Sequence, residues 1–121
     1  MTRTEVAYPG GAVRKRFDLA TTGPIRVAAQ SEAEFMAAVI DEATRTGWLT
    51  YHTHRSDKSG PGFPDCVFVR DRRLVIAEVK KVGGGPTMDQ VRWLLALARV
   101  PAVEVYCWDA KDWDEIVRVL E

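Results

Sequence analysis

The stretch Leu74-Val75-Ile76-Ala77-Glu78-Val79-Lys80 decides the fold of this chain. Its nearly continuous apolar run is typical of a central β-strand that is covered on both faces. Because side chains alternate along a strand, Glu78 and Lys80 point to the same face. A charged pair on so apolar a strand costs free energy to bury unless something compensates for it. The stretch therefore predicts a core strand that carries reactive side chains at its end.

A further carboxylate lies thirteen residues upstream, where Gly60-Pro61-Gly62-Phe63-Pro64-Asp65 leads into the short apolar strand 66–69. If Asp65 and Glu78 stand on adjacent strands, their carboxylates can share one hard cation such as Mg²⁺ or Mn²⁺. Lys80 can then lower the pKa of an attacking water or stabilise developing negative charge. A metal ion, a positioned water and a cation together suit in-line attack on a phosphodiester.

Less specific interpretations of these residues stay open. Asp65 can simply cap a turn after Pro64. Glu78 and Lys80 can form an ion pair on an edge strand. The apolar flanks of the pair and the second carboxylate expected nearby favour the nuclease site.

Periodicity along the rest of the chain predicts the other elements. Ser31 is expected to cap a helix, with the Glu three residues further along as its partner in a capping box. Gly47 is expected to end this helix. Thr87 caps a second helix that ends before Pro101, and Asp109 caps a last short one. The expected strands are 48–54, 66–69, 74–79 and 103–108. The fold class is thus α/β, with the order α-β-β-β-α-β-α and a mixed central sheet of about four strands flanked by helices. The expected domain spans residues 30–121, and residues 1–29 are expected to form an irregular basic arm.

Composition narrows the functional classes. The chain has 121 residues, of which 17 are Lys or Arg and 17 are Asp or Glu, so its formal net charge is zero. This balance excludes a uniformly basic nucleic-acid coat but not a local basic groove. No apolar run is long enough for a membrane span, and no signal-peptide pattern is present. Cys66 and Cys107 are expected to be buried thiols in a reducing compartment, which indicates a cytoplasmic protein. The glycines 83–85 lack the Lys-Ser/Thr of a P-loop, so no nucleotide cofactor is expected.

The pattern Pro64-Asp65 … Glu78-Val79-Lys80 resembles the signature of the PD-(D/E)xK nuclease superfamily. Three further features resemble the VRR-NUC family, especially its small stand-alone phage and bacterial members, over residues 31–119. They are the loop 60–65, the first helix running into Gly47-Trp48 and Tyr51-His52, and Thr87-x-x-Gln90-x-x-Trp93-Leu94. The resemblance implies a restriction-endonuclease-like core and a DNA endonuclease that depends on Mg²⁺ or Mn²⁺.

The resemblance also implies roles for single residues. Asp65, Glu78 and the backbone carbonyl of Val79 bind the metal, Lys80 is the catalytic lysine, and Gln90 lies near the scissile phosphate. A glutamate on the first helix completes the site.

Two candidates compete for this last role. Glu32 shares the face of Phe35, Met36 and Val39, whereas Glu34 is turned by about 200° and faces solvent. Glu32 is therefore favoured, unless it is the reciprocal capping partner of Ser31.

Contacts to DNA are expected beside this site. His52 and His54 lie two apart on a strand and point one way. Arg55, Ser56 and Lys58 lie in the loop before the metal motif and suit phosphate contact. A solvated loop and a partly exposed strand end are the alternatives.

The resemblance to small stand-alone members implies branched DNA as substrate, with the Holliday junction as the leading candidate. A four-way junction has two-fold symmetry and needs paired cuts, which predicts a homodimer. The alternatives are a flap or nicking nuclease, a restriction-type enzyme, and a DNA-binding module that keeps the fold but cleaves little.

Overall fold

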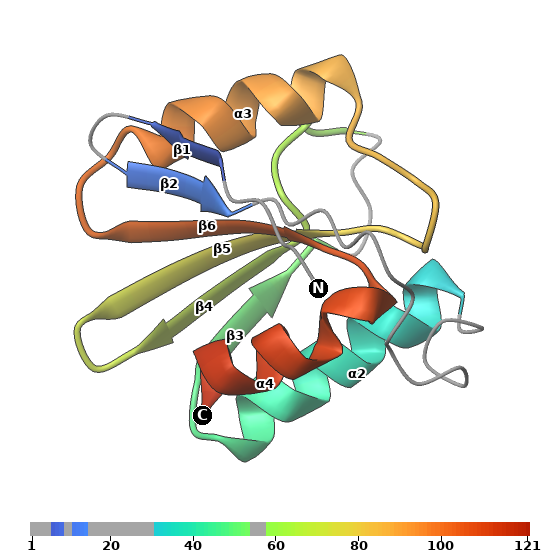
Figure 1. Ribbon diagram of the computed structural model, residues 1–121, viewed down its shortest axis with the longest axis vertical. Coiled ribbons are helices and arrows are strands. Elements are labelled where there is room, and N and C mark those ends of the chain that lie inside the picture. Colours follow the sequence, from blue (N-terminus) through green and yellow to red (C-terminus); the bar gives the residue numbers. More distant parts are fainter. Residues whose placement is uncertain (1–5, 9–10, 15–30, 54–57) are drawn as a thin grey trace.

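A mixed β-sheet with helices on both faces makes up the computed structural model, which describes residues 6–8, 11–14, 31–53 and 58–121 (Figure 1). The elements in chain order are β1 (Val6–Tyr8), β2 (Gly11–Arg14), α2 (Glu32–Arg45), β3 (Leu49–His52), β4 (Cys66–Arg70), β5 (Arg73–Val79), α3 (Met88–Ala98), β6 (Val103–Trp108), the 3₁₀ turn η1 (Ala110–Asp112) and α4 (Trp113–Leu120). From residue 31 onward, this confirms the predicted α/β class and element order.

The strand order in the sheet is β1-β2-β6-β5-β4-β3. Strands β3, β4 and β5 pair antiparallel, and β5 pairs parallel with β6. These four strands are the mixed sheet that the sequence predicts. Between β5 and β6 the chain crosses through α3, because parallel neighbours need a long connection.

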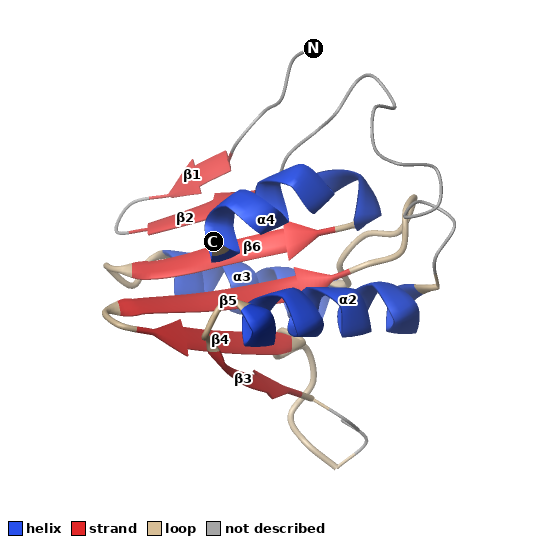
Figure 2. Cartoon of the chain, turned by 90° about the horizontal axis from the view of Figure 1, so that it is seen from below, coloured by secondary structure: helices blue, strands red, loops and turns tan. Residues whose placement is uncertain are grey.

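The helices form two layers around the sheet. Helices α2 and α4 cover one face, and α3 lies on the other (Figure 2). The larger core lies under α2 and α4, where Phe35, Val39, Phe68 and Ile116 are buried. A smaller cluster of Leu94, Ala98 and Val105 lies under α3, which packs on β6 and β2.

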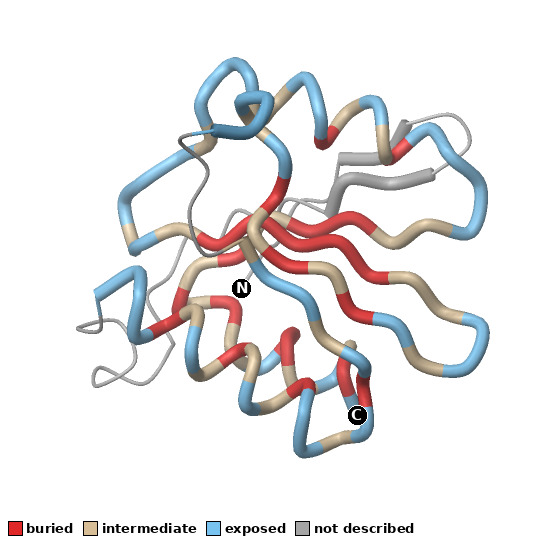
Figure 3. The backbone as a smooth tube through the Cα atoms, turned by 180° about the vertical axis from the view of Figure 1, so that it is seen from behind, coloured by how far each residue is buried: buried red, intermediate tan, exposed pale blue. Residues whose placement is uncertain are grey.

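Strand β5 lies in the middle of this arrangement. Its residues Val75 to Val79 are all buried, as a strand covered on both faces requires (Figure 3). Helices α2 and α3 both begin at the end of the sheet where β5 ends (Figure 1). The first turn of α2 on one face of the sheet and the first turn of α3 on the other therefore lie at this end.

The structure corrects three predicted details. The segment 1–29 is not wholly irregular, because β1 and β2 extend the sheet through the parallel pairing of β2 with β6. The rest of that arm lies outside the described residues. Strand β3 is shorter than expected, since Trp48 precedes it and is buried. Asp109 caps η1, and α4 begins only at Trp113.

At the opposite end of the sheet, two arginines connect the sheet to the C-terminal helix. The guanidinium groups of Arg70 and Arg73 lie 4.5 Å and 4.9 Å from the centre of the Trp48 ring. Arg73 also donates two hydrogen bonds of 2.7 Å to Glu104. Both arginines donate to backbone carbonyls at the end of the chain, Val119 for Arg73 and Leu120 for Arg70. These contacts hold α4 against the sheet and occupy guanidinium donors of both arginines.

Candidate active site

Asp65, Glu78 and Lys80 converge where β4 begins and β5 ends. Cys66 pairs with Ala77, so Asp65 stands beside Glu78 one position further along the ladder. The Asp65 carboxylate accepts a hydrogen bond from the backbone N–H of Val79, with Oδ2 and N 3.0 Å apart. Lys80 Nζ lies 2.9 Å from Glu78 Oε2. The structure thus brings together the three charged side chains of the sequence motif.

The Glu78 side chain is wholly buried, with 0% of its surface exposed. Apart from the ion pair with Lys80, neither carboxylate oxygen has a hydrogen-bond donor among the described residues. Burial raises the pKa of Glu78 to about 7, an effect that the Lys80 ammonium offsets in part and the Asp65 carboxylate adds to. A buried carboxylate with one ammonium as its only charged donor can be compensated further by a bound cation.

Lys80 carries a positive charge at this site. Burial lowers its pKa, but the carboxylates of Glu78, Glu32 and Asp65 outweigh that effect and raise the pKa above its ordinary value. Its side chain remains 15% exposed, so it is accessible from solvent. An ammonium group in these surroundings stabilises negative charge and does not act as a base at neutral pH.

The two glutamates of the first helix have different surroundings. Glu34 completes the capping box: its Oε1 accepts from the Ser31 N–H, and its own N–H donates to Ser31 Oγ, both at 3.1 Å. Glu32 is therefore not the capping partner of Ser31, and its charge acts on Lys80. Its helical spacing predicts an inward-facing side chain, but Glu32 is exposed. The reason is that the first turn of α2 lies at the end of the sheet (Figure 2).

Gln90 is the capping partner of Thr87 at the start of α3. Its Oε1 accepts from the Thr87 N–H at 2.8 Å, and its own N–H donates to Thr87 Oγ1 at 3.2 Å. The side-chain oxygen is thereby occupied, which leaves the amide NH₂ group as the part of Gln90 suited to contact a phosphate.

Of the expected DNA-contact residues, the structure describes His52 and Lys58. His52 is exposed, but it pairs with Cys66 and so points to the opposite face of the sheet from Asp65 and Glu78. This register corrects its expected place at the lip of the site. Lys58 is exposed in the loop before the metal motif. Residues 54–57, which include Arg55 and Ser56, lie outside the described residues.

Sequence reasoning missed a contact that positions the Asp65 loop. The Trp93 indole Nε1 donates to the Pro61 carbonyl at 3.2 Å, and the ring packs edge-to-face on Phe63 with centroids 5.0 Å apart. Gly62 has a positive φ of 91°, and a Cβ there would lie 2.5 Å from the backbone carbon of Asp89. The sequence signal was present: Trp93 precedes the buried Leu94 and stands off the buried stripe of α3.

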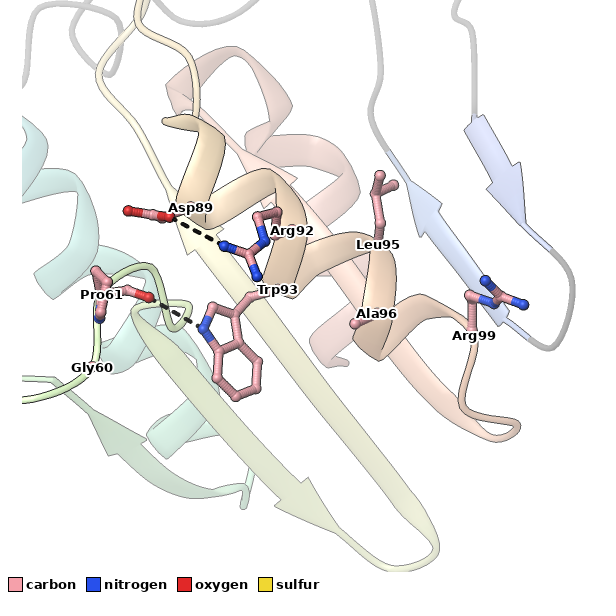
Figure 4. Close-up of a pocket in the computed structure, with 8 residues that line it drawn as sticks. All are labelled: Gly60, Pro61, Asp89, Arg92, Trp93, Leu95, Ala96 and Arg99. Carbon is pink, nitrogen blue, oxygen red and sulfur yellow. Dashed lines mark hydrogen bonds and ion pairs between the residues drawn. The ribbon is translucent and has the colours of Figure 1, made fainter.

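The same contact borders an open groove of about 880 Å³ along α3 (Figure 4). Its lining includes the loop residues Gly60 and Pro61 and, from α3 and its C-cap, Asp89, Arg92, Trp93 and Arg99. Two of these side chains are guanidinium groups and one is a carboxylate.

No disulfide bond joins Cys66 and Cys107. Cys66 is buried, and burial together with the carboxylates of Asp65 and Glu78 raises the pKa of its thiol to about 12. Cys107 is half-buried. The Cys66 thiol is therefore neutral and takes no part in the charge arrangement.

Two carboxylates form the acidic part of this site. Within residues 31–53 and 58–121, no group of three or more His, Cys, Asp or Glu side chains is arranged to hold a metal ion. The oxygen donors near Lys80 suit a cation that keeps several waters, since Mg²⁺ is usually bound by one or two carboxylates.

Comparison of the chain with protein-family models, with curated proteins and with solved structures found no match in any of the three. Among the described residues, no helix has the length and apolar character needed to cross a membrane.

Proposed function

We propose that this protein is a divalent-metal-dependent DNA endonuclease of the VRR-NUC type, with a restriction-endonuclease-like core. The observation that carries the proposal is the environment of Glu78. Apart from its ion pair with Lys80, the buried carboxylate lacks hydrogen-bond donors among the described residues, and it lies beside Asp65 at one end of the sheet. The resemblance of the motif to PD-(D/E)xK nucleases supports the same conclusion.

The donor set fits Mg²⁺ or Mn²⁺. Asp65, Glu78 and the Val79 carbonyl would hold the ion, with Glu32 close enough to act on the charge of Lys80. When bound, such an ion polarises a phosphate oxygen and lowers the pKa of a coordinated water.

The chain's own residues supply the remaining parts of the reaction. The Val79 N–H orients the Asp65 carboxylate, and the ladder places Glu78 next to it. The Lys80 ammonium stabilises the negative charge that develops on the phosphate during attack by water. The exposed carboxylate of Glu32 orients water near Lys80, and the Gln90 amide donates to the scissile phosphate.

We propose a homodimer acting on branched DNA, with the Holliday junction as the leading substrate. Support for self-association comes from an apolar patch on the edge strand β3 and its neighbour β4. Leu49 pairs with Val69, so both share one face with Tyr51, and the three are 76%, 40% and 63% exposed. Apolar patches of this kind mark protein contacts, and a two-fold interface brings two sites to a two-fold symmetric junction.

The test is cleavage of a labelled panel with Mg²⁺ or Mn²⁺: four-way junction, flap, nicked duplex, single strand and plain duplex. Lys80→Ala is expected to lose about a hundredfold or more in rate, as removal of a charge-stabilising donor does. Lys81→Ala is the matched control, because Lys81 is the adjacent lysine and is exposed.

The outcomes separate the candidate functions. Paired symmetric nicks in the junction, lost in Lys80→Ala, support a resolvase. Cutting of flaps, nicked duplex or single strands retains the site and rejects the junction. DNA binding with no cleavage of any substrate contradicts the nuclease and leaves a DNA-binding module.

A further inference from the structure

The Trp93 indole and the Phe63 ring are large aromatic surfaces that the fold leaves in solvent. Trp93 is 42% exposed and Phe63 is 39% exposed, although they pack edge-to-face on each other. The hydrogen bond from Trp93 to the Pro61 carbonyl fixes the orientation of the indole. Two rings held in place with exposed surface offer a platform on which another flat group can stack.

This platform lies on the same side of the sheet as the candidate active site. Glu78 pairs with Cys107, which packs in the cluster under α3, so the Glu78 side chain is directed to the α3 side. Phe63 is two residues before Asp65 on the loop that Trp93 holds. The loop therefore links the rings directly to the candidate metal ligand.

A cation flanks the rings. Arg92 precedes Trp93 on α3, and both side chains extend into the groove (Figure 4). Its ion pair with Asp89 is long, at 3.8 Å, and the side chains are 81% and 50% exposed. A pair this exposed contributes little stability, so Arg92 is available to an external anion.

The charges of the two sides of the molecule differ. The exposed surface of α2 carries Glu32, Glu34 and Asp41 against Arg45, whereas α3 and its C-cap carry Arg92 and Arg99 against Asp89. The exposed surface of α3 is therefore more favourable to a polyanion than that of α2.

We propose that Phe63, Trp93 and Arg92 hold an unpaired nucleotide of the DNA substrate beside the cleavage site, an inference that rests on the proposed nuclease function. The base stacks on the exposed rings, and its phosphate pairs with the Arg92 guanidinium. In an intact duplex each base is stacked between its neighbours and cannot reach the rings. The site thus favours DNA with unpaired bases, such as a single-stranded tail or a junction whose base pairs at the branch point have opened.

The test measures binding with Ca²⁺ in place of Mg²⁺, so that affinity is read apart from cleavage. The probes are a fluorescein-labelled blunt duplex and the same duplex with a single-stranded tail that contains 2-aminopurine. Trp93→Ala is expected to weaken binding of the tailed duplex about tenfold and of the blunt duplex less than twofold. The 2-aminopurine fluorescence is quenched by the wild-type protein and not by Trp93→Ala.

Further variants keep the result interpretable. Trp93→Phe retains an aromatic ring and is expected to retain most of the preference for the tail, which a merely destabilised loop would not. Arg92→Ala is expected to lower the dependence of affinity on salt by about one phosphate contact. Its matched control is Arg118→Ala, an equal charge change on the exposed surface of α4, which is expected to leave binding unchanged.

Three results would overturn the proposal. One is an equal loss of affinity on both probes in Trp93→Ala, and another is no loss at all. The third is a change of mass by light scattering in Trp93→Ala, which would make the rings a contact between copies of the chain. Failure of the stacking site leaves cleavage by the wild-type protein intact, whereas failure of the nuclease proposal shows as no cleavage in Mg²⁺ whatever the binding preference.

Discussion

The Asp65 carboxylate accepts a hydrogen bond from the backbone N–H of Val79, the residue between Glu78 and Lys80, with 3.0 Å between the two atoms. One oxygen of Asp65 therefore joins the loop before β4 to the end of β5. This bond gives Asp65 a structural role beside its proposed role as a metal ligand.

The two roles of Asp65 can be separated by substitution. Asp65→Asn keeps a side-chain oxygen that can accept from Val79, so stability is expected to change by less than about 1 kcal/mol while cleavage is lost. Asp65→Ala also leaves the Val79 N–H without its acceptor and is expected to cost about 1–2 kcal/mol more. Urea unfolding and junction cleavage measure the two effects. Equal stability of the two variants would contradict the structural role.

Metal binding is expected to stabilise the protein through Glu78. Mg²⁺ at about ten times its Kd stabilises the folded state by about 1.4 kcal/mol, which raises the melting temperature by a few degrees. Glu78→Gln is expected to abolish this rise, because an amide is a far weaker ligand than a carboxylate. EDTA should reverse the rise in the wild-type protein.

The control for this metal prediction is Glu121→Gln, which removes an exposed carboxylate at the end of the chain. It is expected to keep the full Mg²⁺ response in differential scanning fluorimetry. A metal response retained in Glu78→Gln would show that the ion binds elsewhere.

Glu32 is expected to matter for activity and not for stability. It is exposed, and its charge acts on Lys80. Glu32→Gln should lower the cleavage rate about ten- to a hundredfold and leave the melting temperature unchanged. A rate equal to that of the wild type under single-turnover conditions would exclude Glu32 from the site.

Glu34 is expected to show the opposite behaviour, with a dependence on pH. Backbone and side-chain hydrogen bonds from Ser31 hold the pKa of Glu34 below its ordinary 4.5. A carboxyl group whose pKa is lowered by folding stabilises the folded state above its ordinary pKa, and this stabilisation is lost as the pH falls through the lowered value.

Glu34→Ala should therefore melt below the wild type at pH 7, and the difference should shrink as the pH falls below about 4.5. Cleavage at neutral pH should be unaffected. Thermal unfolding followed by circular dichroism across this range measures the effect, and a difference that does not vary with pH would rule out the charged capping contact.

Gln90 offers a test that keeps the capping box intact. A Glu at this position accepts the Thr87 N–H as Gln does, so Gln90→Glu is expected to be as stable as the wild type. Its negative charge repels a phosphate and removes the amide donor, so DNA cleavage should fall about tenfold. Unchanged cleavage would limit Gln90 to its capping role.

Local patterns made much of the fold predictable. The apolar run ending in Glu78 and Lys80 identified the central strand, and Ser31 and Thr87 identified two helix starts, because caps and periodicity act over a few residues. The order of elements from residue 31 onward follows from these signals. Strands β1 and β2 escaped prediction, because they are short and β2 depends on pairing with β6, some ninety residues away.

Side-chain directions were less predictable than element types. His52 was expected at the site, yet its pairing with Cys66 directs it to the other face of the sheet. The capping box between Ser31 and Glu34 followed from the spacing of the two residues, but only the tertiary structure decided that Glu32 is exposed and not turned inward.

The sequence by itself determined which residues carry the proposed chemistry, since Asp65, Glu78 and Lys80 stand out as charges next to apolar strands. Only the tertiary structure decided that Glu78 is fully buried, that its one donor in the described chain is the Lys80 ammonium 2.9 Å away, and that Trp93 holds the Asp65 loop. The physical reason is one of range. Alternation and capping are set by neighbours in sequence, whereas burial and ion pairing depend on strands and helices that meet only when the sheet has formed.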